Sequence, residues 1–114
     1  MKSARILGSL LSLSLLIVPT VMAAQKDSPA KEAKEGSSIF ESKCFACHGK
    51  DAKGQTAMGK TLKIRDLHSA EVQKQTKEEL TKIIEDGKGK MPAYKGKLSK
   101  DQINDLVDYI KSLK

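Results

Sequence analysis

The sequence has little of what usually stabilises a small domain. Its 114 residues include no Trp, two Tyr, two Phe, two Cys and two His. Chains this short bury little apolar surface, and many of them depend on disulfides or a bound group. A disulfide between two cysteines so close in sequence would close a very short loop and stabilise little. The scarcity of aromatic side chains and cysteines therefore predicts that a large apolar cofactor completes the core.

Long hydrophobic runs are also missing. The longest, residues 6–18, has about 13 residues, whereas a membrane-spanning helix needs about 20, so stable membrane insertion is not expected. Two basic residues precede this run, and small residues follow it. The layout is typical of a secretory signal peptide. We expect residues 1–23 to be that signal, with cleavage after residue 23 or 24, and the mature protein to be periplasmic.

The positive charge is dispersed along the chain. The formal net charge is +7, and it falls by two when the predicted signal is removed. Basic residues form no runs of Arg and do not alternate with aromatic residues, so a nucleic-acid partner is not expected. The excess of Lys instead favours redox partner proteins with acidic docking surfaces. Residues 24–36 have nothing to bury and predict a flexible charged linker, followed by one domain over residues 37–114.

Helical periodicity dominates that domain, and no segment alternates as a strand would. A first helix is expected to start at Ser37 or Ser38. Residues 51–65 are rich in Gly and Lys and predict a loop, whereas residues 69–73 predict a single helical turn. Two later helices are predicted by capping boxes, which are Thr76 with Glu79 and Ser99 with Gln102. The sequence therefore predicts an all-α fold of three or four short helices.

Cys44-Phe45-Ala46-Cys47-His48 places two cysteines one helical turn apart, directly before a histidine. We name these five residues the haem motif, because the spacing is typical of c-type haem attachment. The two thiols can reach both vinyl groups on one porphyrin edge, and the histidine can then ligate the iron. A thioredoxin-like redox pair would need a βαβ context, and no strand pattern precedes the motif. A structural zinc site would need four ligands, and the sequence offers no second ligand pair. We predict one haem c bound through Cys44 and Cys47, with His48 as an axial ligand.

Met91 is the predicted second axial ligand. Pro92 restricts Met91 to an extended backbone, which helps to direct its side chain from a loop into a pocket. Methionine suits haem iron, and His/Met ligation raises the reduction potential. Gly87, just before this loop, is expected to be a left-handed C-cap. Met58 is expected to pack against the haem or the core, and His68 to be a surface residue.

The chain resembles the bacterial class I c-type cytochromes of the small monohaem kind. Gly36 and Phe40 precede the haem motif as in the first helix of that family, and Met91-Pro92 matches the segment of its sixth ligand. The resemblance implies a cytochrome c-like fold around one covalently bound haem. It also implies that Gly36 and Phe40 pack against Leu106 and Tyr109 of the last helix.

One departure from the family concerns the haem histidine. Many relatives place a Pro about ten residues after that histidine, and the Pro carbonyl accepts the ring N–H that fixes its tautomer. This chain has no Pro between His48 and Met91. A backbone carbonyl within residues 54–59 is therefore expected to replace it.

The resemblance implies that the protein transfers electrons through a haem iron that cycles between Fe(II) and Fe(III). It also implies that the protein is a monomer and not an enzyme. A ring of lysines is expected near the exposed haem edge, where a partner would dock; its members are Lys88, Lys90, Lys95 and Lys97. Two other interpretations stay open. One is a haem-based gas sensor in which Met91 leaves the iron, and the other is an electron-transfer subunit of a larger oxidoreductase.

Overall fold

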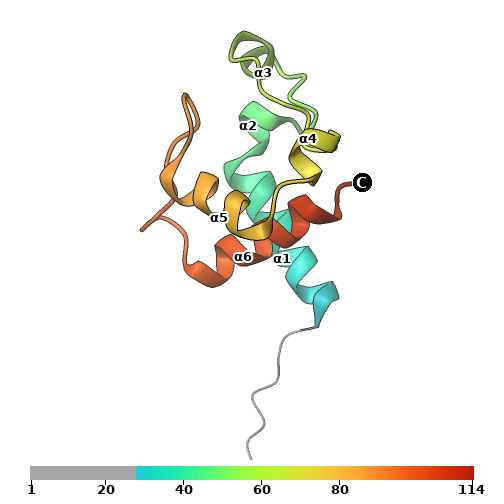
Figure 1. Ribbon diagram of the computed structural model, residues 1–114, viewed down its shortest axis with the longest axis vertical. Helices are drawn as coiled ribbons and strands as arrows, with labels where there is room; N and C mark the ends of the chain where they lie inside the picture. The colour runs from blue at the N-terminus through green and yellow to red at the C-terminus, as the bar shows by residue number, and fades with distance from the viewer. Residues whose placement is uncertain (1–27) are drawn as a thin grey trace, which may run out of the picture.

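The computed structural model describes residues 28–114. The predicted signal peptide and the first residues of the predicted linker lie outside this range. Within it the chain forms six helices and no strand, so the all-α prediction is confirmed, although three or four helices were expected. None of these described helices is long and apolar enough to cross a membrane. In chain order they are α1 (Pro29–Lys43), α2 (Phe45–His48), α3 (Ala57–Thr61), α4 (Ala70–Gln73), α5 (Lys77–Asp86) and α6 (Lys100–Ser112) (Figure 1).

The first helix begins earlier than predicted. α1 starts at Pro29 rather than at Ser37 or Ser38, so the segment expected to be a flexible linker is helical from residue 29 onwards. Pro29 occupies the first turn, where its missing N–H costs no hydrogen bond. The Ala, Lys and Glu residues after it favour helix by intrinsic propensity. They bury little apolar surface, which is why the hydrophobic pattern alone did not detect them.

The short helices differ from the prediction in two places. Cys44 is a turn residue between α1 and α2, so the expected first helix is divided there. α3 lies within residues 51–65, where a loop was predicted, and Thr56 caps it by accepting a hydrogen bond from the Gly59 N–H at 2.8 Å. α4 confirms the single helical turn predicted after Ser69.

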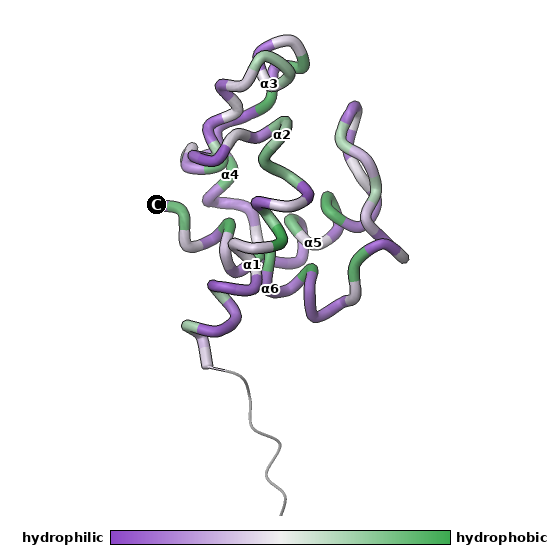
Figure 2. The backbone as a smooth tube through the Cα atoms, turned by 180° about the vertical axis from the view of Figure 1, so that it is seen from behind, coloured by the Kyte–Doolittle hydropathy of each residue, from purple (hydrophilic) through white to green (hydrophobic). Residues whose placement is uncertain are grey.

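The two longer helices after α4 begin at their capping boxes. The Thr76 hydroxyl accepts a hydrogen bond from the Glu79 N–H at 3.1 Å, and the Glu79 carboxylate accepts one from the Thr76 N–H at 2.8 Å. The same reciprocal pair starts α6. Gly87 ends α5 with the expected positive φ of 75°, but its ψ of 169° is extended rather than left-handed helical. Figure 2 shows hydrophilic and hydrophobic stretches alternating along both helices, as amphipathic helices require.

α1 and α6 cross in close contact at the centre of the fold (Figure 1). Gly36 lies so near α6 that a Cβ there would stand 2.1 Å from the Asp105 carbonyl oxygen. The Phe40 ring is 1% exposed and packs on Tyr109, with ring centroids 5.3 Å apart. Leu106 belongs to the same buried cluster, so the packing implied by the resemblance is confirmed. The buried apolar residues are Ile39, Phe40, Ala52, Val72, Leu80, Ile84, Ile103, Leu106, Val107 and Ile110.

Side-chain hydrogen bonds fasten the segment around α4 to the last helix. The Gln73 side-chain amide donates to the carbonyls of Leu67 at 2.7 Å and Ile110 at 2.9 Å. The Lys111 ammonium donates to the carbonyls of Gln73 and Gln75. Three of these bonds, those to the Ile110, Gln73 and Gln75 carbonyls, join residues 36 to 38 positions apart in the chain and hold this segment beside α6.

Candidate haem site

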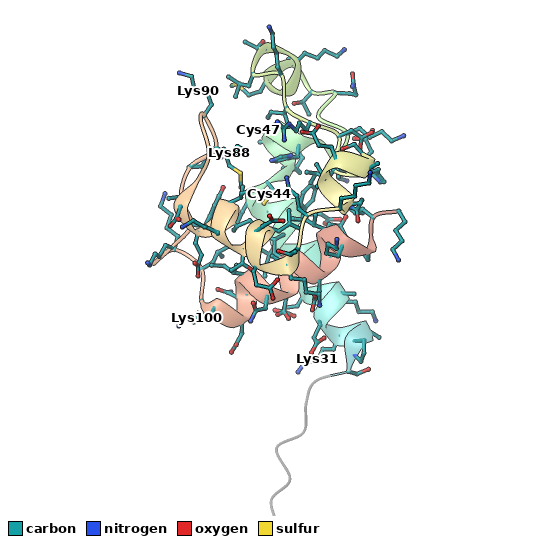
Figure 3. The ribbon with its side chains drawn as sticks, in the orientation of Figure 1. Lys31, Cys44, Cys47, Lys88, Lys90 and Lys100 are labelled. Atoms are coloured by element: carbon teal, nitrogen blue, oxygen red, sulfur yellow. The ribbon has the colours of Figure 1, made fainter. Side chains whose placement is uncertain are left out.

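The haem motif spans the junction of α1 and α2. Its backbone stays close to helical, because the Cys44 N–H donates to the Phe40 carbonyl at 2.9 Å and the His48 N–H donates to the Cys44 carbonyl at 3.0 Å. Cys44 and Cys47 are half-buried and not disulfide-bonded. They lie close together on this part of the chain (Figure 3). The motif therefore presents two free thiols about one helical turn apart, as the spacing predicted.

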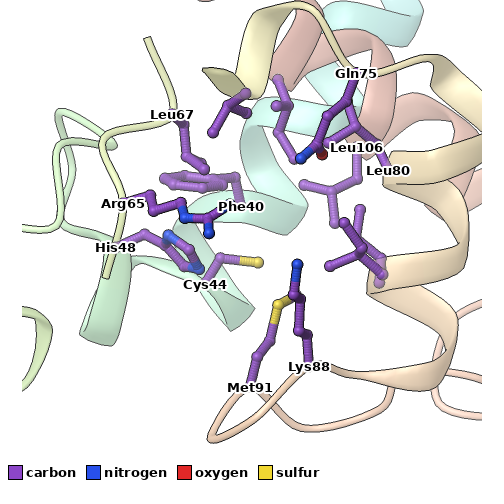
Figure 4. A pocket seen from close by; sticks show the side chains of 14 residues that line it. Phe40, Cys44, His48, Arg65, Leu67, Gln75, Leu80, Lys88, Met91 and Leu106 are labelled. Atoms are coloured by element: carbon purple, nitrogen blue, oxygen red, sulfur yellow. The ribbon is translucent and has the colours of Figure 1, made fainter. Parts of the chain in front are cut away.

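Met91 faces the haem motif from a separate segment of the chain. This segment, residues 87–98, we name the Met91 loop. The backbones of Lys88 and Met91 pair through two hydrogen bonds of 3.2 and 3.0 Å. Gly87 allows this fold-back, since a Cβ there would lie 2.6 Å from the Met91 carbonyl oxygen. Figure 4 shows the Met91 and Cys44 sulfur atoms and the His48 ring around one cavity.

Two adjoining cavities separate the Met91 loop from the haem motif, and both are lined by Cys44, His48, Lys88 and Met91. The inner cavity has mostly apolar walls, formed by Phe40, Leu67, Val72, Leu80, Ile83, Ile84, Leu106 and Ile110. The outer cavity adds apolar and basic residues, namely Leu62, Ile64, Pro92, Tyr94, Lys43, Lys63 and Lys90. An apolar interior with a charged rim suits a large flat cofactor that has polar groups at its edge.

His48 has one ring nitrogen without a partner. Nδ1 is buried and makes no hydrogen bond within the described residues. Burial also lowers the pKa of His48, which favours the neutral imidazole that metals bind. The expected carbonyl from residues 54–59 does not accept this N–H, so that prediction is wrong. The segment bonds the motif's backbone instead, through the Gly54 N–H to the His48 carbonyl at 2.7 Å and the Thr56 hydroxyl to the Cys47 carbonyl at 2.8 Å.

The Cys44 thiol does not have the environment of a reactive redox cysteine. Burial raises the pKa of Cys44 from 9.0 to about 11, and the neighbouring Cys47 adds to this rise. Reactive cysteines need a lowered pKa, because the thiolate is the nucleophile. The environment is therefore unlike that of a thioredoxin-like pair. The two thiols, the neutral His48, the Met91 sulfur and the apolar cavity together fit a covalently bound haem.

Other residues singled out from the sequence lie elsewhere. His68 contacts the Asp66 carboxylate through Nδ1 at 2.9 Å and lines neither cavity, as expected of a surface residue. Met58 is 52% exposed and also lines neither cavity, so the prediction that it packs in the core is wrong, whereas contact with the haem stays a prediction. α3, the helix that the sequence pattern did not predict, holds it at the surface. Arg65 and Gln75 line the inner cavity, and no sequence pattern marked them.

Comparison with known proteins gives consistent matches. The family model described as "Cytochrome C oxidase, cbb3-type, subunit III" matches residues 31–110. Cytochrome c6 of Leptolyngbya boryana is 39% identical over 79 residues, which cover 69% of this chain and 89% of the relative. The "Cbb3-type cytochrome c oxidase subunit FixPc" of Rhizobium leguminosarum bv. viciae is 34% identical over 83 residues, 71% of this chain but 28% of the relative. The solved structure of the "KustC0563 c-type cytochrome" gives a TM-score of 0.64 at 30% identity, covering 69% of this chain and 96% of that one.

These matches agree with the geometry of the site. The family match begins within α1 and ends within α6, so it includes the haem motif and the Met91 loop. The likeness in three dimensions extends over nearly the whole of the solved cytochrome. The chain therefore belongs to the c-type cytochrome family, as a small class I member that binds haem c covalently and transfers electrons.

Proposed function

We propose that this chain is a periplasmic electron carrier, exported by a signal peptide at residues 1–23. Cys44 and Cys47 attach the haem in this proposal, and His48 and Met91 are the axial ligands of its iron. The observation that supports it most directly is the convergence of the His48 ring and the two sulfur atoms of Cys44 and Met91 on one cavity (Figure 4). When bound, haem supplies a one-electron Fe(II)/Fe(III) couple.

The protein's own residues set the properties of that couple. The buried environment of His48 keeps the imidazole neutral and available to the iron. The mostly apolar walls of the inner cavity would surround a bound haem with few polar groups, which would favour the less charged ferrous state and raise the potential. If His48 and Met91 both bind the iron, no coordination position is left for a substrate. The site is therefore suited to electron transfer rather than to catalysis.

Optical spectra of the exported haem protein in both redox states test the ligation. The wild type is expected to be six-coordinate and low-spin, with a Met–Fe(III) charge-transfer band that Met91→Ala abolishes. Met58→Ala is the matched control, because Met58 is exposed and lines neither cavity. A band that survives in Met91→Ala would refute Met91 as the ligand. A five-coordinate ferrous wild type that binds CO readily would favour the gas-sensor interpretation instead.

The proposed partner is a redox protein with an acidic docking surface. Four exposed lysines line the outer cavity: Lys43, Lys63, Lys88 and Lys90. This set revises the ring expected from sequence, because Lys95 lines a separate hollow between α5 and α6. Electron-transfer rates with an acidic partner should fall as ionic strength rises, since salt screens such charges. Rates that do not change with salt would contradict the docking proposal.

The second candidate function is an electron-transfer subunit of a larger oxidoreductase. The description of the matching family and the similarity to FixPc support it. The two candidates differ in what the haem protein is bound to in the cell. A free carrier is recovered alone from the periplasmic fraction, whereas a subunit co-purifies with its oxidase from solubilised membranes.

A further inference from the structure

The Met91 loop is attached mainly to the helix that precedes it. The Tyr94 N–H donates to the Ile84 carbonyl of α5 at 3.0 Å. Three half-buried side chains of the loop, Met91, Tyr94 and Leu98, pack against the core. Most other loop residues are exposed. The position of Met91 over the cavity therefore depends on few contacts.

One of these contacts crosses to the other side of the site. The Tyr94 hydroxyl donates to the carbonyl of Lys43 at 3.0 Å, over a separation of 51 residues. Lys43 directly precedes the first haem cysteine. This hydrogen bond joins the Met91 loop directly to the end of α1. Burial raises the pKa of Tyr94, with Cys44 and Cys47 adding to the rise, which agrees with a phenol that lies beside the haem motif.

Charge across the cavity opposes this closed arrangement. Two lysines of the Met91 loop, Lys88 and Lys90, line the outer cavity together with Lys43 and Lys63. Like charges around one cavity repel each other, and their exposure to solvent keeps this repulsion small. A specific contact between the two sides is what would offset this repulsion.

We propose that Tyr94 is a positioning residue for the axial ligand. Its hydroxyl holds the Met91 loop against the end of α1 and so keeps the Met91 sulfur over the cavity. The inference rests on the proposed ligation by Met91. A neutral hydrogen bond of this kind shifts an equilibrium by about 2-fold to 10-fold. Tyr94→Phe keeps the ring and its packing, removes only the hydroxyl, and should increase the population of the open loop by that factor.

Imidazole binding to the ferric, haem-loaded protein measures this population. Imidazole takes the iron position that Met91 leaves, and the Met–Fe(III) charge-transfer band disappears as it binds. The apparent affinity scales with the fraction of protein in the open state, so Tyr94→Phe should bind imidazole about 2-fold to 10-fold more tightly than the wild type. Tyr109→Phe is the matched control, because the Tyr109 ring packs on Phe40 while its hydroxyl makes no hydrogen bond within the described chain.

The outcomes separate the two proposals. Tighter imidazole binding in Tyr94→Phe alone, with helicity unchanged by circular dichroism, supports Tyr94 as a positioning residue. Equal affinity in Tyr94→Phe and the wild type overturns it and leaves Met91 ligation intact. An equal gain in both Phe variants also overturns it, because the effect is then a general loosening. A wild type without the charge-transfer band overturns the ligation itself, and the role of Tyr94 with it.

Discussion

Replacing Gly36 by Ala tests how closely α1 and α6 approach. The new Cβ would lie 2.1 Å from the Asp105 carbonyl oxygen, 2.7 Å from its carbonyl carbon and 2.8 Å from the Tyr109 Cβ. An ordinary carbon–oxygen contact is about 3.3 Å, so the helices must separate by roughly 1 Å. The Asp105 atoms are backbone and cannot rotate aside. The substitution therefore forces a change in the crossing on which the core is built.

The magnitude follows from two opposing effects. Ala favours helix over Gly by about 1 kcal/mol. Overpacking of a well-packed core costs about 3 kcal/mol at the upper end of its usual range, and the upper end applies because the clash is with backbone. The free energy of unfolding should therefore fall by about 2 kcal/mol. For a domain of this size that corresponds to a drop in Tm of about 8–16 °C.

Thermal unfolding of the haem-loaded protein, followed by far-ultraviolet circular dichroism, measures the effect. Ser38→Ala is the control, because Ser38 is exposed on the same helix and its substitution improves helix propensity without a clash. The expected order of Tm is Ser38→Ala at or above the wild type, and Gly36→Ala well below both. If Gly36→Ala melts at or above Ser38→Ala, the close approach of the two helices is not a constraint and the reasoning fails.

Two further predictions concern the Met91 loop and the charge between α1 and α6. Gly87→Ala should weaken or abolish the Met–Fe(III) band, because its Cβ would lie 2.6 Å from the Met91 carbonyl oxygen at a φ of 75°. Gly89→Ala carries the same kind of backbone strain, at a φ of 60°, but has no atom within 4 Å of its Cβ, so it should weaken the band less. Burial raises the pKa of Asp105, with Glu32 and Glu35 of α1 adding to the rise, so the folded protein binds this proton more tightly than the unfolded chain. Ionised Asp105 therefore costs stability above its raised pKa, and Asp105→Asn should increase Tm at neutral pH. That gain should vanish below the ordinary pKa of Asp, at about pH 3; the same gain at both pH values would contradict the assignment.

The sequence predicted those features that depend on local chemistry. A capping box needs only a hydroxyl residue and, three residues later, a carboxylate or amide side chain. The boxes that start at Thr76 and Ser99 are both present in the structure. The placement of His48 and Met91 around one cavity agrees with ligand types and spacing that are readable along the chain. The close contact of Gly36 with α6 came from the resemblance to a family rather than from periodicity.

What could not be predicted depends on tertiary contacts or on weak propensities. The first two turns of α1 bury little, so hydrophobic periodicity had no signal there. α3 begins at a cap on Thr56 within a Gly- and Lys-rich segment, and a five-residue helix leaves no measurable period. The unpaired Nδ1 of His48 reflects how residues 54–59 fold back on the motif's backbone. Arg65 and Gln75 reach the cavity only because the chain around α4 is held beside α6.

The buried thiol of Cys44 also bears on the order of events during maturation. A rise of its pKa from 9.0 to about 11 reduces the reactive thiolate about 100-fold at neutral pH. Cys44 packs against a core whose two central helices come from opposite ends of the domain. That core can form only after the last helix has been synthesised. Folding before haem attachment would therefore leave the Cys44 thiol less reactive than it is in the unfolded chain.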